Sequence, residues 1–226
     1  MIKLENVSKT YRLSGENRVE AVCDISLEIA KGEFLIVTGR SGSGKTTLLN
    51  LISGLARPSS GRVLFEDVDL WSLPDAQQSL QRNRKIGFVF QFPSLLPSLT
   101  AIENVSLPTV FSANHMKQSA YQRSADLMKM LGLVEKKSSY PRQLSAGQQQ
   151  RVVIARALFH QPEILVADEP TSDLDEQTEL EIMDLFKEIH SQSGVTIVLV
   201  THSTQLVHYG TRSLRMASGR LVEGDA

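Results

Sequence analysis

Residues 39–46 are Gly39-Arg40-Ser41-Gly42-Ser43-Gly44-Lys45-Thr46, which match the pattern G-x-x-x-x-G-K-[ST] of a phosphate-binding loop. The apolar run at 34–37 predicts a buried strand before the loop, and apolar residues at helical spacing over 48–55 predict a helix after it. This order of strand, loop and helix is the context that such a loop needs, and it disfavours an ordinary turn. The pattern predicts a site for a nucleoside triphosphate and leaves the reaction open.

The chemistry of the loop follows from its residue types. Three glycines let the backbone curl so that successive N–H groups point at an anion, and the helix beginning near Lys45 adds unpaired N–H groups. Lys45 can reach the β- and γ-phosphates, where an ammonium about 4 Å from one negative charge gains on the order of 4 kcal/mol at an effective dielectric near 20. The Thr46 hydroxyl is placed to bind Mg²⁺. The expected nucleotide-binding residues of this loop are Gly39, Arg40, Ser41, Gly42, Ser43, Gly44, Lys45, Thr46 and Thr47.

Length and composition narrow the class of protein. The 226 residues suffice for one large domain or for a core with a subdomain, and the formal net charge of −1 argues against nucleic acid as the partner. A single cysteine, Cys23, has no internal disulfide partner and is expected to be a small apolar filler on a strand. The N-terminus has no apolar secretory core, and no run approaches the ~18 apolar residues of a membrane span. We therefore expect a chain that does not cross a membrane by itself.

Polar side chains recur where predicted buried strands end. Gln91 follows the apolar segment 86–90, Asp168 and Glu169 follow 163–167, and His202 follows 195–201. Open α/β sheets bind ligands at this edge, outside the carboxyl ends of the strands. Asp168 suits a contact to Mg²⁺, and Gln91 could offer its amide oxygen to Mg²⁺ or to an attacking water. Glu169 would polarise that water as a general base, and His202 could sense the γ-phosphate by a hydrogen bond.

Two further places admit both a structural and a functional interpretation. Ser145 and Gln148 form the capping box of a helix that begins near 145, yet a Ser hydroxyl, bare N–H groups and Gly147 at a helix N-terminus also form a phosphate-binding face. Tyr11 is either an ordinary half-exposed strand tyrosine or a stacking partner for a nucleobase. The residues alone leave both questions open.

The remaining segments predict an α/β protein with an insert. Apolar and polar residues alternate in places over 2–7 and 19–29, which predicts antiparallel strands with one solvent-exposed face. Ser218-Gly219 predicts the turn of a hairpin near the end of the sequence. Segment 92–140 reads as a mostly helical insert, whose irregular apolar start is either a docking face for another protein or core packing. We expect a core with a β subdomain at about 1–91 and 160–226 and a helical subdomain at about 92–159.

Taken in this order, the phosphate loop, Gln91, Leu144–Gln148, Asp168–Glu169, Ser172–Asp175 and His202 resemble the nucleotide-binding subunit of ATP-binding-cassette (ABC) transporters, over essentially the whole chain. Leu144-Ser145-Ala146-Gly147-Gln148 is similar to the signature that separates this family from other phosphate-loop enzymes. Ala146 stands where the signature normally has Gly, and Asp173 where the following loop normally has a small residue. These two departures leave their effect on turnover open.

The resemblance implies an ABC ATPase fold, in which a RecA-like phosphate-loop core carries an antiparallel β subdomain and a helical subdomain. It implies ATP and Mg²⁺ as cofactors, Thr46, Gln91 and Asp168 as metal ligands, and Lys45, Gln91, Glu169 and His202 as catalytic residues. It selects Tyr11 as the adenine-stacking residue. Each ATP would lie in a head-to-tail homodimer, between the phosphate loop of one copy and Ser145, Gly147 and Gln148 of the other.

The resemblance also implies a partner and a place in the cell. The segment after Gln91 would meet an integral membrane permease, so that the chain would sit in the cytoplasm on the inner face of the membrane. Gly87–Gln91 and Leu95–Val105 look most like the group of lipoprotein-release and macrolide exporters. An ATPase of the cell-division type, which signals through a membrane partner without moving cargo, is the alternative. A small-molecule kinase is disfavoured by Glu169 beside Asp168.

Overall fold

The computed structural model describes residues 1–12, 18–111 and 117–222. They form two compact units, one made of the described residues within 1–82 and 195–222 and the other of those within 83–194. Helix α2 (Asp75–Lys85) contains the first boundary between them. The phosphate loop belongs to the first unit and the acidic strand end at Asp168–Glu169 to the second.

The first unit contains an antiparallel sheet in the strand order β2-β1-β4-β5. Its strands are β1 (Ile2–Arg12), β2 (Arg18–Ile29), β4 (Ser60–Phe65) and β5 (Val68–Asp69). In β2 the residues Ile25, Leu27 and Ile29 are buried while their neighbours are exposed, which confirms the predicted alternation with one wet face. The loop expected at 14–17 lies outside the described residues.

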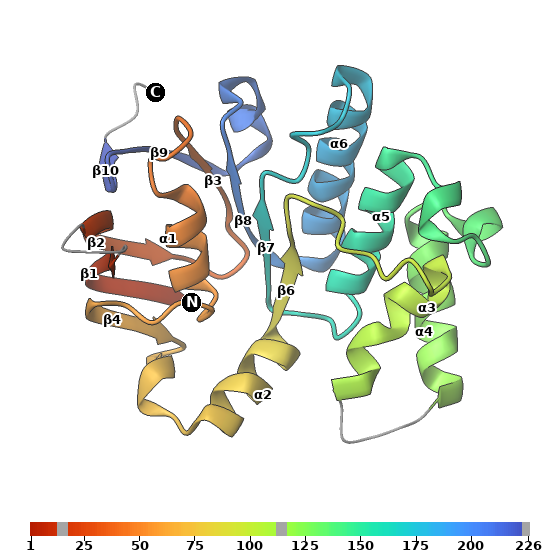
Figure 1. The fold of residues 1–226 in the computed structure, drawn as a ribbon, viewed down its shortest axis with the longest axis horizontal. Coiled ribbons are helices and arrows are strands. Elements are labelled where there is room, and N and C mark those ends of the chain that lie inside the picture. Colours follow the sequence, from red (N-terminus) through yellow and green to blue (C-terminus); the bar gives the residue numbers. More distant parts are fainter. Residues whose placement is uncertain (13–17, 112–116, 223–226) are drawn as a thin grey trace. The chain divides into compact units, whose positions relative to one another are not determined.

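The first unit also contains the strand that leads into the phosphate loop. Strand β3 pairs in parallel with β8 and β9, and β9 turns back into β10 (Figure 1). All five residues of β3 are buried, as a strand covered on both faces requires. The elements are β3 (Phe34–Thr38), α1 (Lys45–Ile52), η1 (Leu70–Ser72), β8 (Thr196–Thr201), η5 (Thr204–Tyr209), β9 (Arg212–Ala217) and β10 (Arg220–Val222).

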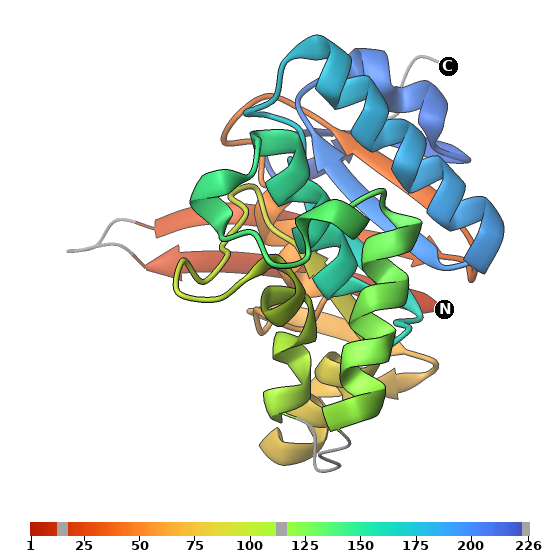
Figure 2. The same cartoon turned by 90° about the vertical axis from the view of Figure 1, so that its right-hand side faces the viewer.

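The second unit combines two parallel strands with helices. Helices α3, α4 and α5 contact one another and form a group in both views (Figures 1 and 2). Helix α6 contacts α5 and buries the predicted stripe that includes Ile182, Phe186 and Ile189. The elements are β6 (Ile86–Val89), α3 (Ala101–Ser106), η2 (Leu107–Phe111), α4 (Lys117–Met130), η3 (Val134–Lys136), η4 (Pro141–Gln143), α5 (Ala146–Ala157), β7 (Ile164–Asp168) and α6 (Glu176–Ser193).

One strand end differs from the prediction. Strand β6 ends at Val89, and Phe90, expected as its last buried residue, is 43% exposed. The Phe90 ring stacks on Phe88 with centroids 5.7 Å apart, so it is held outside the core by an aromatic contact. Within the described part of the chain, no helix is both long and apolar enough to span a membrane.

Candidate functional site

The phosphate loop connects β3 to α1, as its sequence predicts. Gly44 is the N-cap of α1 with φ 102°. Because glycine has no side chain, it makes no side-chain capping hydrogen bond to the first turn of the helix. The backbone oxygen of Gly44 accepts the first helical hydrogen bond from Leu48 N at 2.9 Å. A glycine N-cap leaves the first N–H groups of the helix uncapped by a side chain of that residue, which is the arrangement an anion uses.

Each glycine of the loop has its own structural reason. Gly42 has φ 76°, a conformation that strains any residue with a Cβ atom. A Cβ atom on Gly39 would overlap the carbonyl oxygen of Met216 in β9, and one on Gly44 would overlap the carbonyl oxygen of Ala21 in β2. Gly42 and Gly44 therefore supply the positive φ that curls the loop, while Gly39 and Gly44 lie against β9 and β2 where a Cβ atom would not fit.

Lys45 already lies along the loop. Its side chain is 5% exposed, and Nζ donates hydrogen bonds to the backbone oxygens of Gly39 at 2.7 Å and Arg40 at 3.2 Å. The ammonium is thus held against the loop rather than extended into solvent. This placement reduces the side-chain entropy lost when a phosphate binds.

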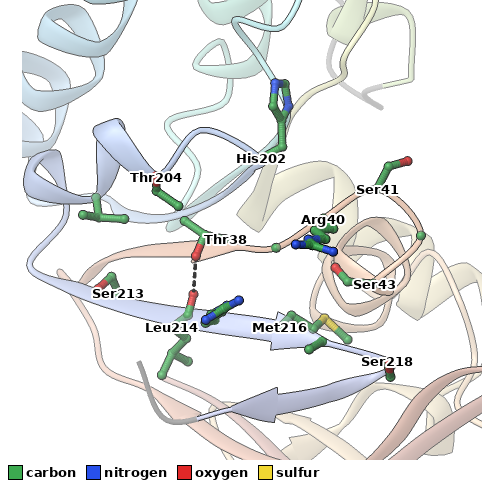
Figure 3. Close-up of a pocket in the computed structure, with 15 residues that line it drawn as sticks. Thr38, Arg40, Ser41, Ser43, His202, Thr204, Ser213, Leu214, Met216 and Ser218 are labelled. Atoms are coloured by element: carbon green, nitrogen blue, oxygen red, sulfur yellow. Dashed lines mark hydrogen bonds between the residues drawn. The ribbon is translucent and has the colours of Figure 1, made fainter. Parts of the chain in front are cut away.

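His202 lies with the loop in a pocket of about 1,160 Å³ (Figure 3). The parallel register explains the meeting, because Thr38 of β3 pairs with Thr201 of β8 and the next residues are Gly39 and His202. The pocket's other wall is β9, where Leu214 accepts a hydrogen bond from Thr38 Oγ1 at 3.3 Å. The pocket is lined by Thr38, Gly39, Arg40, Ser41, Gly42, Ser43, His202, Thr204, Val207, Ser213, Leu214, Arg215, Met216, Ala217 and Ser218.

In the second unit, register brings the other two strand ends together. Val89 of β6 pairs with Ala167 of β7, so Gln91 and the pair Asp168–Glu169 follow at the same edge of the two strands. Glu169 has φ 43°, in the left-handed region that a residue with a long side chain rarely adopts. Backbone strain of this kind costs on the order of 1–3 kcal/mol and clusters at functional sites.

The start of α5 has the predicted cap. Ser145 is the N-cap: its Oγ accepts from Gln148 N at 3.2 Å, and Gln148 Oε1 accepts from Ser145 N at 3.1 Å. Gly147 is buried, and a Cβ atom there would lie 2.6 Å from Thr178 Cγ2 of α6. Helix packing alone therefore accounts for this glycine. Ala146, at the first position of the helix, is exposed.

Two residues outside these groups have defined environments. Tyr11 is 39% exposed near the end of β1, with Lys9 Nζ 5.1 Å from its ring centroid. Cys23 is buried in β2, and burial raises the pKa of its thiol. Both observations agree with the prediction that Cys23 is a small apolar side chain that fills space on a strand.

Sequence patterns do not reveal which residues of other segments pack against the phosphate loop. Ala21 acts through its backbone oxygen, and Met216 acts through its oxygen and its Sδ-methyl carbon, which a Cβ on Gly44 would meet at 2.8 Å. Contacts made by backbone atoms do not depend on the residue type, so the sequence does not indicate which distant segments make them. A glycine that tolerates no Cβ is the only local sign of them.

Comparison with known proteins identifies the family. A model of the ABC transporter family matches residues 22–172. The chain is 40% identical to the lipoprotein-releasing system ATP-binding protein LolD of Syntrophus aciditrophicus, covering 98% of this chain and 99% of that protein. It is 44% identical to the macrolide export ATP-binding/permease protein MacB of Syntrophobacter fumaroxidans, covering 97% of this chain but 31% of that longer protein.

A solved structure agrees in fold over the same length. The ATP-binding cassette MJ0796 of Methanocaldococcus jannaschii, determined as a dimer in a post-hydrolysis state with ADP and Pi, matches with a TM-score of 0.90 and 41% identity. The match covers 99% of this chain and 97% of that one. The expected ABC ATPase fold is therefore confirmed, and this chain belongs to the ABC transporter family, as an ATP-binding subunit that hydrolyses ATP.

Proposed function

We propose that the chain is the motor subunit of an export or lipoprotein-release system, working as a homodimer that closes on two ATP molecules and reopens after hydrolysis. Its near full-length likeness to an ATP-binding protein of a lipoprotein-releasing system supports this. The observation that carries the proposal is the loop itself: Lys45 is held against its backbone, and loop residues 39–43 line one pocket with His202.

In this proposal the chain's residues divide the work of hydrolysis. Lys45 and the loop N–H groups hold the β- and γ-phosphates, while Tyr11 offers its exposed ring to the adenine. Glu169 orients and polarises the attacking water, and His202 contacts the γ-phosphate. Across the dimer, Ser145, Gly147 and Gln148 of the second copy close the far side of the nucleotide.

The oxygen groups proposed to hold Mg²⁺ suit that ion. Thr46 is exposed in the first turn of α1, Gln91 is exposed, and Asp168 is half-buried. Mg²⁺ prefers oxygen ligands and commonly takes only one or two carboxylates, with phosphates and waters completing its shell. When bound, Mg²⁺ would neutralise charge on the transferring phosphoryl group.

Substitution of Glu169 by Gln tests the catalytic assignment. Loss of a general base costs about 10²–10⁴ in rate, so Glu169→Gln should retain ATP binding, nearly stop hydrolysis and accumulate as an ATP-bound dimer in size-exclusion chromatography. The matched control is Glu163→Gln. Glu163 directly precedes β7, and its carboxylate forms a surface ion pair with Lys85 at 3.2 Å. Wild-type turnover by Glu169→Gln would remove the residue from the base role.

Substitution of Lys45 tests the phosphate loop by binding rather than by turnover. We expect Lys45→Ala to weaken ATP affinity in a calorimetric titration, while Lys31→Ala, in an exposed turn of the same unit, leaves it unchanged. Equal affinity for the two variants would contradict the assignment.

The segment after β6 is proposed to dock on the membrane permease. Phe90, Phe92 and Leu96 are 43%, 64% and 43% exposed, which is unusual for three large apolar side chains so close in sequence. The backbone that carries them is nevertheless held firmly. Arg156 of α5 donates to the carbonyl oxygens of Ser94 at 2.9 Å and Pro93 at 3.3 Å.

A charge at the centre of this surface tests the docking. Phe92→Glu should lose co-purification with the membrane permease of the system and should lose stimulation of ATPase activity by that permease. Tyr121→Glu, at a side chain that is 60% exposed on α4, is the control for a new charge elsewhere on the unit. Undiminished co-purification of Phe92→Glu would exclude this surface. The proposed location, on the inner face of the membrane through the permease alone, depends on the same result.

A further inference from the structure

The turn between β9 and β10 contacts the phosphate loop through Gly219, which does not itself line the pocket, whereas its neighbour Ser218 does. Ala217 of β9 pairs with Arg220 of β10, so Ser218 and Gly219 form a two-residue turn. Both have positive φ, 47° and 77°, as a tight turn matched to the twist of its strands requires. The turn is therefore rigidly defined by its own hairpin.

Gly219 joins two other segments through its backbone. Its N–H donates to the carbonyl oxygen of Ser43 in the phosphate loop at 3.0 Å, and its carbonyl oxygen accepts from Cys23 N of β2 at 2.8 Å. One residue thus bridges the loop to the antiparallel sheet. The bridge is closely packed, since a Cβ atom on Gly219 would lie 2.9 Å from Cys23 Sγ and 3.1 Å from the Ala21 oxygen.

The bond to Ser43 sets the direction of a group that faces the nucleotide. The Ser43 carbonyl and the Gly44 N–H belong to one planar trans peptide, so they point to opposite sides. When the carbonyl is held toward Gly219, the Gly44 N–H is turned to the opposite side of the peptide, away from Gly219. Rotation of this peptide would exchange a donor for an acceptor at the anion.

We propose that Gly219 is a positioning residue for ATP binding, which fixes the Ser43–Gly44 peptide and so orients the Gly44 N–H toward the phosphates. The residue acts through the loop and touches no substrate itself. Of all residue types, glycine alone supplies both the positive φ and the space beside Cys23.

Gly219→Ala tests the proposal, with ATP affinity as the readout. Because a hydrogen bond to a charged group contributes about 1.5–3 kcal/mol, misdirecting one donor should weaken ATP affinity at least about tenfold. The rise should show in KM, with kcat at saturating ATP retained. Adding Cys23→Ala removes the nearest obstacle to the new Cβ, so the double variant should recover part of the affinity.

Gly132→Ala is the matched control, because Gly132 also has positive φ, 70°, and no atom lies within 4 Å of its Cβ position. It introduces backbone strain after α4 without touching the loop. Both variants are compared below their melting temperatures. Unchanged ATP affinity in Gly219→Ala, or an equal loss in Gly132→Ala, would overturn the proposal.

A measurement on the unmodified protein decides the matter if Gly219→Ala does not fold. ATP bound only by the intact loop should suppress opening of the Gly219–Ser43 bond by a factor of 1 + [ATP]/Kd, about a hundredfold at one hundred times Kd. Hydrogen exchange of the Gly219 amide should slow accordingly. The Gly132 amide, bonded to Lys129 O at 3.1 Å, is the reference and should not slow to that extent. Equal behaviour of the two amides would refute the positioning role.

Discussion

Asn104 is expected to hold the exposed segment that follows β6, and its removal gives a quantitative test. The side chain is fully buried in α3. Its Oδ1 accepts from Leu96 N at 2.8 Å, and its Nδ2 donates to the oxygens of Leu96 at 3.1 Å, Leu99 at 3.1 Å and Thr100 at 3.0 Å. One amide therefore replaces the regular backbone pairing that this proline-broken segment lacks.

The magnitude follows from the number of atoms that can bond. An amide has one acceptor oxygen and two N–H groups, so its four contacts amount to about three full hydrogen bonds. At about 1 kcal/mol net for each, Asn104→Ala should lower the free energy of opening this segment by about 3 kcal/mol. Such a change raises the exchange rate of the Leu96 amide about a hundredfold.

Hydrogen exchange of the Leu96 amide is the appropriate assay, because the segment can open without unfolding the unit. Gln122→Ala is the control, since that amide makes one exposed bond, to Asp126 Oδ1 at 2.9 Å on the same helix. Exposed pairs at this spacing contribute about 0.2–0.5 kcal/mol. An Asn104→Ala protein whose Leu96 amide exchanges within threefold of the wild-type rate would refute the argument.

The remaining predictions concern the start of α5 and α6. Gly147→Ala should destabilise the protein by about 1–3 kcal/mol through overpacking against Thr178 Cγ2; adding Thr178→Ser removes that methyl and should restore the melting temperature, whereas no rescue would mean that the contact is not the cause. Hydrogen bonds from the Thr178 side chain and backbone hold the pKa of Asp175 below its usual range. Because the folded pKa is lowered, the Asp175 cap stabilises the protein above its unfolded pKa near 4 and is lost as pH falls further. The difference in melting temperature between wild type and Asp175→Ala should therefore be full at pH 7 and shrink below about pH 4, and a difference independent of pH would contradict it.

The sequence by itself determined the chemistry and the family. The phosphate loop, Gln91, Asp168–Glu169 and His202 are recognisable because each is a short local pattern at the end of an apolar run. The sequence placed Gln91 and Glu169 at strand ends, and the parallel register of β6 and β7 in the structure brings these ends to one edge. The capping box at Ser145 was equally predictable, since it spans only four residues.

Tertiary structure alone decided which backbone atoms support the site. The loop rests on Ala21, Met216 and Gly219, whose contributions are a carbonyl oxygen, a packed methyl and an N–H. Every residue type carries these backbone groups, so no pattern of side chains marks them. The prediction that Phe90 is buried was wrong, because an aromatic at a strand end satisfies burial or stacking equally well until its neighbours are in place. Local chemistry is written in residue types, whereas contacts between segments about 175 residues apart, such as Ser43 and Gly219, exist only once the chain has folded.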